Sequence, residues 1–148
     1  MSPILRRVLV LVACCGLSTP LAAQQPLHKD SLEIVRRAAH FFYTGEADSL
    51  IAMLAPGTLA DFGGREGLLA GISQVGMRAG DEVEVVEERW NLRNGQRQYW
   101  RTSKMTIFPD DFLVRFNINS EGLITGIGMG PARSAPPIEA QGPVIPRP

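Results

Sequence analysis

"VEVVEERWNLRNGQRQYWRTSKMTI", residues 83–107, carries the strongest structural signal in this sequence. Residues 83–90 and 97–107 are predicted to be strands, because the chain changes here from a helical period to a period of two. Asn94 and Gly95 lie between them and have the composition of a two-residue hairpin loop, in which both positions need a positive φ. The segment therefore predicts two adjacent antiparallel strands.

A two-residue loop also predicts which residues of the two strands lie opposite each other. The expected pairs on one face are Trp90 with Tyr99, Glu88 with Arg101, and Val86 with Ser103. An acid and a guanidinium beside two aromatic rings can orient the polar group of an otherwise apolar ligand. Trp90, Tyr99, Arg101 and Glu88 are therefore the candidate ligand-binding residues. The alternative is an ordinary exposed ion pair worth about 0 to 1 kcal/mol, with the two rings covering a core or a dimer face.

The segments on either side of this hairpin complete an α+β pattern. Upstream, a capping box at residues 30–33 begins a predicted helix that Gly45 ends, and further helices are expected over residues 47–54 and 65–75. Downstream, residues 112–118 and 123–129 are expected to be strands, separated by turns. Helices followed by a strand meander predict an antiparallel sheet with the helices packed on one face.

Gly126, Gly128 and Gly130 recur at every second position near the end of the last predicted strand. A dinucleotide-binding loop would need glycine rather than Pro131 and a following helix, so a phosphate loop is not expected. With a period of two, the glycines are predicted to share a face with Ile124. A bare strand face permits close approach of a neighbouring group, strong curvature or a ligand, and the first two are favoured.

The first 23 residues have the pattern of a bacterial signal peptide. Two arginines at positions 6 and 7 precede an apolar run over residues 8–17, which is too short to span a membrane, and Ala23 provides a small residue for cleavage. The alternative is a lipoprotein signal, since residues 11–14, LVAC, resemble a lipobox and would leave Cys14 lipidated. The protein is thus expected to be periplasmic or secreted, with a membrane as partner only if Cys14 carries lipid.

Cleavage after Ala23 removes both cysteines and leaves 13 basic against 15 acidic side chains. The mature chain then has no thiol for a disulfide, a nucleophile or a metal site. A net charge of about −2 gives no electrostatic reason to expect a nucleic acid partner. Residues 24–131 have the length of one domain, and the proline-rich residues 132–148 are expected to form a disordered tail.

Two further segments resemble the NTF2-like superfamily, which includes the SnoaL-like and ketosteroid isomerase-like proteins. "FFYTGEADSLIAMLAP", residues 41–56, has a helix, a Gly-acid turn and a second helix, and "FNINSEGLITGIGMGP", residues 116–131, has the closing strands. The resemblance implies a cone, with N-terminal helices packed on a curved antiparallel sheet, a homodimer and a small hydrophobic ligand. Within the superfamily the chain is similar to bacterial DUF3887-type domains, which often accompany exported hydrolases.

Asp61 and His40 are the candidates for acid–base catalysis. Asp61 lies beside the apolar Phe62 and could be a pocket carboxylate, and histidine is the side chain most often used as a general base. Each also has a structural interpretation, Asp61 as a turn or cap residue and His40 as a lone helix histidine. When the resemblance is applied residue by residue, the ketosteroid isomerase tyrosine falls on Ala38 and its aspartate falls next to Asp61. No metal signature and no cofactor are expected.

These observations support three hypotheses. The favoured one is an exported, non-catalytic small-molecule-binding or accessory module. The second is a SnoaL-like isomerase, cyclase or hydrolase that uses Asp61 or His40. The third is a structural dimerisation protein of the cell envelope, which a cone filled by aromatic side chains would favour.

Overall fold

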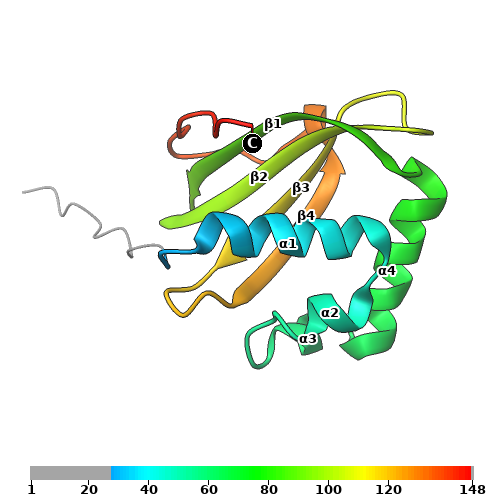
Figure 1. Cartoon of the computed structure of the whole chain (residues 1–148), viewed down its shortest axis with the longest axis horizontal. Helices are drawn as coiled ribbons and strands as arrows, with labels where there is room; N and C mark the ends of the chain where they lie inside the picture. Colours follow the sequence, from blue (N-terminus) through cyan, green and yellow to red (C-terminus); the bar gives the residue numbers. More distant parts are fainter. Residues whose placement is uncertain (1–27, 148) are drawn as a thin grey trace, which may run out of the picture.

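The computed structural model describes residues 28–147 and has the predicted α+β architecture (Figure 1). The elements in chain order are α1 (Ser31–Thr44), α2 (Ala47–Ile51), α3 (Thr58–Asp61), α4 (Gly64–Ala79), β1 (Glu82–Arg93), β2 (Gln96–Met105), β3 (Phe112–Ile118), β4 (Ile124–Pro131) and the short 3-10 helix η1 (Ala132–Ser134). The four strands form one antiparallel sheet in the order β1-β2-β3-β4. None of the described helices has the length and apolarity needed to cross a membrane. The predicted leader lies outside the described residues.

Helix α1 crosses one face of the sheet, and α4 stands at one end of it, where the chain enters β1 (Figure 1). Gly45 ends α1 with a left-handed φ of 74°, as predicted. The predicted capping box is wrong, because the Asp30 side chain makes no cap hydrogen bond. Instead, the Ser31 hydroxyl donates to the His28 carbonyl oxygen at 2.5 Å.

Helices α2 and α4 differ from their predicted ranges, and a further helix was not predicted. The structure adds the four-residue helix α3, and α4 covers residues 64–79 rather than 65–75. Helix α2 ends at Ile51 because residues 53–55 turn to the edge of β4, where Ala55 N donates to Ile124 O at 2.8 Å and Ile124 N donates to Met53 O at 2.9 Å. Sheet pairing, which depends on residues distant in the sequence, therefore ends this helix.

The hairpin between β1 and β2 has the predicted turn, with φ of 53° at Asn94 and 70° at Gly95. The predicted pairs Trp90–Tyr99 and Glu88–Arg101 are confirmed. The predicted pair of Val86 with Ser103 is wrong, because β1 carries a bulge and Val85 lies opposite Ser103. A second bulge between Glu82 and Glu84 bends the start of β1 further.

We expect Gly95→Ala to destabilise the protein by about 1–2 kcal/mol, because alanine is strained at a left-handed φ. The hairpin would remain, since its register also depends on the core face of β2. Urea denaturation followed by tryptophan fluorescence measures this loss. Gly71→Ala in α4 is the matched control, because its φ is not left-handed and an added Cβ meets open space. Equal stability of the two variants would contradict the strain at position 95.

The glycine repeat of β4 faces away from the helices, so the predicted face is wrong. A bulge between the pairs Asn117–Gly126 and Ile118–Ile124 reverses the alternation before Gly126. Ile124 is fully buried on the helix side, whereas a Cβ at Gly128 would collide with the Arg115 guanidinium on the opposite side. The glycines therefore make room for the arginine side chain, a close approach of the kind that bare strand positions permit.

Aromatic and aliphatic side chains fill the space between α1 and the sheet. Phe42 of α1 belongs to the same buried cluster as Tyr99 and Phe116, whose ring centroids lie 6.4 Å apart. Val35, Val114 and Ile124 are also fully buried. Among the described residues, packed side chains therefore occupy the centre of the predicted cone.

The chain after β4 packs on the sheet, which differs from the disordered tail that its composition predicts. It passes behind the sheet, on the face opposite α1, and then follows β1 (Figure 1). Leu92 N donates to Ala140 O at 2.8 Å, and Ile145 N donates to Glu88 O at 2.8 Å. Ile145 is only 8 % exposed and joins the core. Prolines fit here because this segment lies at a sheet edge, where not every N–H is needed for pairing.

Candidate functional site

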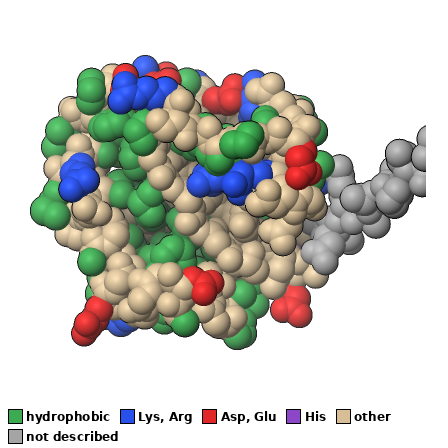
Figure 2. All heavy atoms as spheres, turned by 180° about the vertical axis from the view of Figure 1, so that it is seen from behind, with side chains coloured by type: hydrophobic (Ala, Val, Ile, Leu, Met, Phe, Trp, Pro, Cys, Tyr) green, Lys and Arg blue, Asp and Glu red, His purple; other side chains and the backbone are tan. Residues whose placement is uncertain are grey.

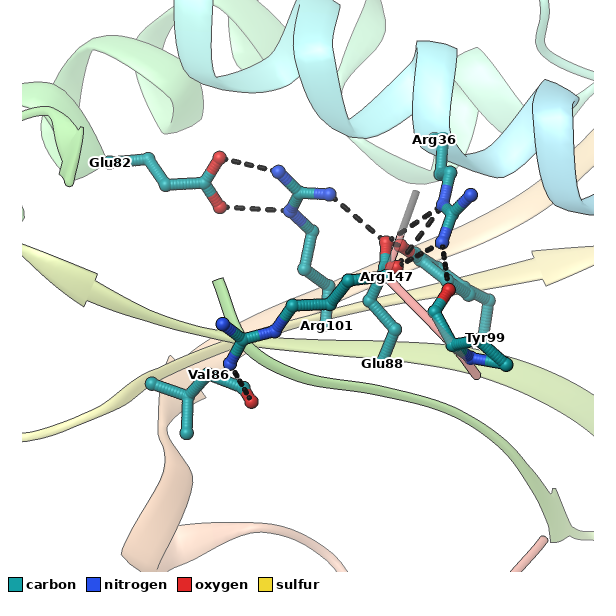
Figure 3. Close-up of polar contacts among 8 residues, drawn as sticks. Arg36, Glu82, Val86, Glu88, Tyr99, Arg101 and Arg147 are labelled. Atoms are coloured by element: carbon teal, nitrogen blue, oxygen red, sulfur yellow. Dashed lines mark hydrogen bonds and ion pairs between the residues drawn. The ribbon is translucent and has the colours of Figure 1, made fainter. Parts of the chain in front are cut away.

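Four charged side chains alternate in sign along the helix-facing side of β1 and β2 (Figure 3). Arg101 contacts Glu82 through Nη2 and Oε2 at 2.6 Å, and it contacts Glu88 through Nη1 and Oε1 at 3.0 Å. Arg36 of α1 contacts the other side of Glu88, with Nη2 2.6 Å from Oε2. We call Glu82, Arg101, Glu88 and Arg36 the ionic chain.

Local sheet geometry places the first three members of the ionic chain. The hairpin register puts Glu88 opposite Arg101. An undistorted ladder would pair Glu82 with Ile107, whereas the two β1 bulges bring it opposite Met105, closer to Arg101. Glu82 then accepts hydrogen bonds from Arg101 Nε at 2.8 Å and from the Ser103 hydroxyl at 2.5 Å. The bulges thus give Arg101 a bidentate carboxylate partner.

Glu88 is the buried centre of the ionic chain, with its side chain only 3 % exposed. It accepts hydrogen bonds from Arg36, Arg101 and the Tyr99 hydroxyl. Burial acts to raise the pKa of Glu88, but the hydrogen bonds from Arg36 and Tyr99 and the two positive charges outweigh it. The net result is a pKa below the usual glutamate value, so Glu88 is ionised at neutral pH.

The pKa values of Arg101 and Tyr99 are also shifted by this environment. Burial acts to lower the pKa of Arg101, but its contacts with Glu82 raise it above the usual arginine value. Burial raises the pKa of Tyr99, and the adjacent Glu88 carboxylate adds to that rise. Arg101 therefore stays charged and the Tyr99 phenol stays neutral, so neither residue can serve as a general base near neutral pH.

An open cleft of about 570 Å³ lies against the outer end of the ionic chain. Its lining residues come from the C-terminal part of α1, the start of β1 and the middle of β2: His40, Tyr43, Thr44, Asp81, Glu82 and Arg101. A second hollow of about 360 Å³ shares Tyr43 and Thr44 with the cleft. Its other lining residues include Phe42, Ile72, Val75 and Met77. The two hollows together offer a polar wall and an apolar wall that meet at Tyr43.

Tyr43 has an unusual hydroxyl. Within residues 28–147, its oxygen is buried and has no hydrogen-bond partner. Burial raises the pKa of Tyr43 and the negative charge of Glu82 raises it further, whereas the Ser103 side chain and the charge of Arg101 lower it. The Ser103 hydroxyl is close enough to affect this pKa, but it is hydrogen-bonded to Glu82 and does not meet the geometry of a hydrogen bond with Tyr43. A buried hydroxyl without a partner is destabilising by about 1–3 kcal/mol. A ligand that supplied a hydrogen bond here would recover part of that energy.

The structure separates the predicted ligand-binding residues. Arg101 lines the cleft, while Glu88 and Tyr99 lie behind it and hold the guanidinium in place. Trp90 packs edge-on against Tyr99 at 5.7 Å and borders a different hollow, of about 190 Å³, beside residues 140–143. The predicted cross-strand pair is therefore a buried support, not the exposed ion pair of the alternative interpretation.

The two catalytic candidates also lie apart. Asp61 is exposed at the end of α3 and does not line either hollow at Tyr43. His40 borders the cleft with an exposed side chain, and its Nε2 lies 3.6 Å from Glu46 Oε1. Of the two candidates, only His40 lines this cleft. The described residues hold no group of three or more metal-ligating side chains.

Sequence reasoning missed Arg36, Tyr43 and Glu82. For two of them a signal was present in the helical stripe that begins at Leu32. Arg36 follows Leu32 by four residues, and Tyr43 follows Arg36 by seven. A charged residue in such a stripe predicts a buried partner of opposite charge. Glu82 had no comparable signal, since its position depends on two bulges.

Comparisons of this chain with models of protein families, with curated proteins and with solved structures give no match.

Proposed function

We propose that this protein is a non-catalytic module that binds a small molecule in the cleft beside Arg101. The observation that carries the proposal is the position of Tyr43, which lines both the polar and the apolar hollow and whose buried hydroxyl has no hydrogen-bond partner among residues 28–147. Small-molecule sites typically combine an apolar surface with a few convergent polar groups. The cleft and the adjoining apolar hollow together have both features.

The lining residues favour an amphipathic ligand. Phe42, Ile72 and Val75 provide a surface for an apolar body. The Tyr43 hydroxyl and the Glu82–Arg101 pair can then meet one polar group that both donates and accepts hydrogen bonds. The ionic chain behind Arg101 limits movement of the guanidinium, which reduces the entropy lost on binding.

The same proposal includes export of the protein and an NTF2-like fold. Export is supported by the signal-peptide pattern of residues 1–23. The NTF2-like assignment is supported by the order of helices and antiparallel strands, together with the sequence resemblance. A homodimer and an accessory role beside exported enzymes belong to this proposal as consequences of that resemblance.

A structural role in the cell envelope is the second candidate. It is favoured by the packed interior, where Phe42, Tyr99 and Phe116 belong to one buried cluster. The ionic chain would then act only to align α1 with β1. Ligand binding in the cleft beside Arg101 distinguishes the two candidates.

We expect Gly76→Leu to weaken small-molecule binding strongly, because Gly76 lines the apolar hollow and a side chain there enters open space. The measurement is a titration with Nile red, a neutral dye with an apolar ring system and a carbonyl group. Its fluorescence rises when it leaves water. Wild-type protein should give a saturable rise, and Gly76→Leu should give little. Native mass spectrometry of protein isolated from its own host provides the second readout, a retained small molecule.

Gly71→Leu is the matched control, because Gly71 also lies in α4 and faces open space but does not line the hollow. It should bind the dye like the wild type. If the wild-type protein binds no dye and retains no small molecule from its host, the structural candidate is favoured. Equal binding by Gly76→Leu and wild type would place the dye elsewhere and overturn the proposed site.

A further inference from the structure

The face of the sheet opposite α1 carries two arginines, Arg93 of β1 and Arg115 of β3, which border one hollow. Figure 2 shows this back face, where Lys and Arg side chains lie among apolar and uncharged groups over the sheet. Within the described part of the chain, neither Arg93 of β1 nor Arg115 of β3 forms an ion pair with a carboxylate. The Nε of Arg93 is buried and has no hydrogen-bond partner among residues 28–147. Buried donors of this kind are usually satisfied, so an additional acceptor is expected.

The two arginines line one small hollow. Its volume is about 150 Å³, and its other lining residues are Gln98, Asn117, Gly126, Ile127 and Gly128. Two guanidinium groups and two side-chain amides therefore border the same space, and the described residues of this lining include no acid. A volume of this size is enough for one small anion.

The bare glycines of β4 create this space. Gly126 and Gly128 lie opposite Asn117 and Arg115 in the β3–β4 ladder. The Arg115 guanidinium lies across Gly128, where an added Cβ would displace it. Its Cζ also lies 5.6 Å from the centre of the Trp100 ring. The strand surface and the indole together hold Arg115 at the edge of the hollow.

The electrostatics of the hollow favour an anion. Burial lowers the pKa of Arg115, and the positive charge of Arg93 lowers it further. Both effects mean that the charged form of Arg115 is less well stabilised here than in water. A bound anion would act against both of them, because it provides an opposite charge and acceptor atoms within a partly dry site.

We propose that Arg93 and Arg115, with the amides of Gln98 and Asn117, form a binding site for an oxyanion group, a phosphate or a carboxylate. Guanidinium groups match both through paired N–H donors, and the amides add further donors. The site lies on the opposite face of the sheet from the cleft at Arg101.

Isothermal titration calorimetry at constant ionic strength tests the site with inorganic phosphate and acetate in separate arms, and with chloride as the reference anion. Wild-type protein is expected to bind at least one oxyanion. Arg93→Gln and Arg115→Gln should each weaken binding about tenfold or more, because each removes charge-assisted hydrogen bonds. Preference for phosphate or for acetate identifies which group the site accepts.

Two further variants make the result specific. Gly128→Ala keeps both arginines but displaces the Arg115 guanidinium, so it should also weaken binding. Arg78→Gln removes the same charge from an exposed position on α4 and should leave binding unchanged. The proposal is overturned by either of two results: no wild-type binding at about 10 mM of either oxyanion, or binding that Arg93→Gln and Arg115→Gln do not weaken more than Arg78→Gln.

Discussion

Glu88→Gln is expected to lower the free energy of unfolding by about 3 kcal/mol, near the lower end of the range for breaking a buried ion pair. The substitution leaves Arg36 without its carboxylate and removes one of the two acids that contact Arg101. The loss is not larger because Arg36 is 27 % exposed and Arg101 keeps Glu82. Glutamine has nearly the same shape as glutamate, so the loss measures charge and hydrogen bonding rather than a cavity.

Urea denaturation followed by tryptophan fluorescence measures this effect, and Glu87→Gln is the control. Glu87 neighbours Glu88 on β1 and pairs with Arg89, but its side chain is 37 % exposed. Its loss should cost about 0–1 kcal/mol, as for other surface ion pairs. A similar cost for both variants would show that the ionic chain behaves as an ordinary surface pair.

The difference between wild type and Glu88→Gln should also depend on pH. The pKa of folded Glu88 lies below the ordinary value of 4.5. Its ionised carboxylate therefore contributes its full stability above the ordinary pKa, and that contribution decreases as the pH falls towards the folded pKa. Denaturation at a series of acidic pH values should show the two proteins converging. A constant difference across that range would contradict the assigned shift.

Ile145→Ala is expected to lower the free energy of unfolding by about 2–3 kcal/mol, because the side chain fills a site in the core. Ile145 is 8 % exposed and belongs to the same cluster as Val35 and Tyr99. The cost is below the maximum for such a substitution because the end of the chain can separate locally from β1. The same denaturation experiment measures it.

The adjacent Val144→Ala provides the control, since Val144 is 51 % exposed. It should change stability by no more than about 0.5 kcal/mol. An Ile145→Ala variant as stable as Val144→Ala would mean that the tail does not contribute to the core in solution.

The tail and the ionic chain support each other at Glu88. Ile145 N donates to the Glu88 carbonyl oxygen at 2.8 Å, and Arg36 Nη2 donates to the Pro146 carbonyl oxygen at 3.1 Å. Arg147 Nη2 donates to Val86 O at 2.9 Å, at the bulge (Figure 3). The C-terminal segment therefore covers the edge of β1 beside the buried carboxylate. Such cover also protects the sheet from pairing with another chain along this part of the edge.

Local sequence rules determined the hairpin and much of the order of helices and strands along the chain. The Asn94-Gly95 turn depends on the φ angles of two residues, and the register of the next several pairs follows from the loop length. The apolar stripe and terminal glycine of α1 are equally local. These features were predictable because each depends on residues close together in the chain.

Tertiary structure decided the parts that form the candidate sites. The β1 bulges brought Glu82 to Arg101, and the β4 bulge turned the glycines away from Ile124. The packing of α1 placed Arg36 against Glu88, and the tail became part of the core through Ile145. A bulge changes which face every later residue occupies, and the partners of a buried charge come from distant elements. Their energies depend on contacts that no single segment contains, which is why the sequence alone predicted Glu88 and Arg101 but not the cleft that they support.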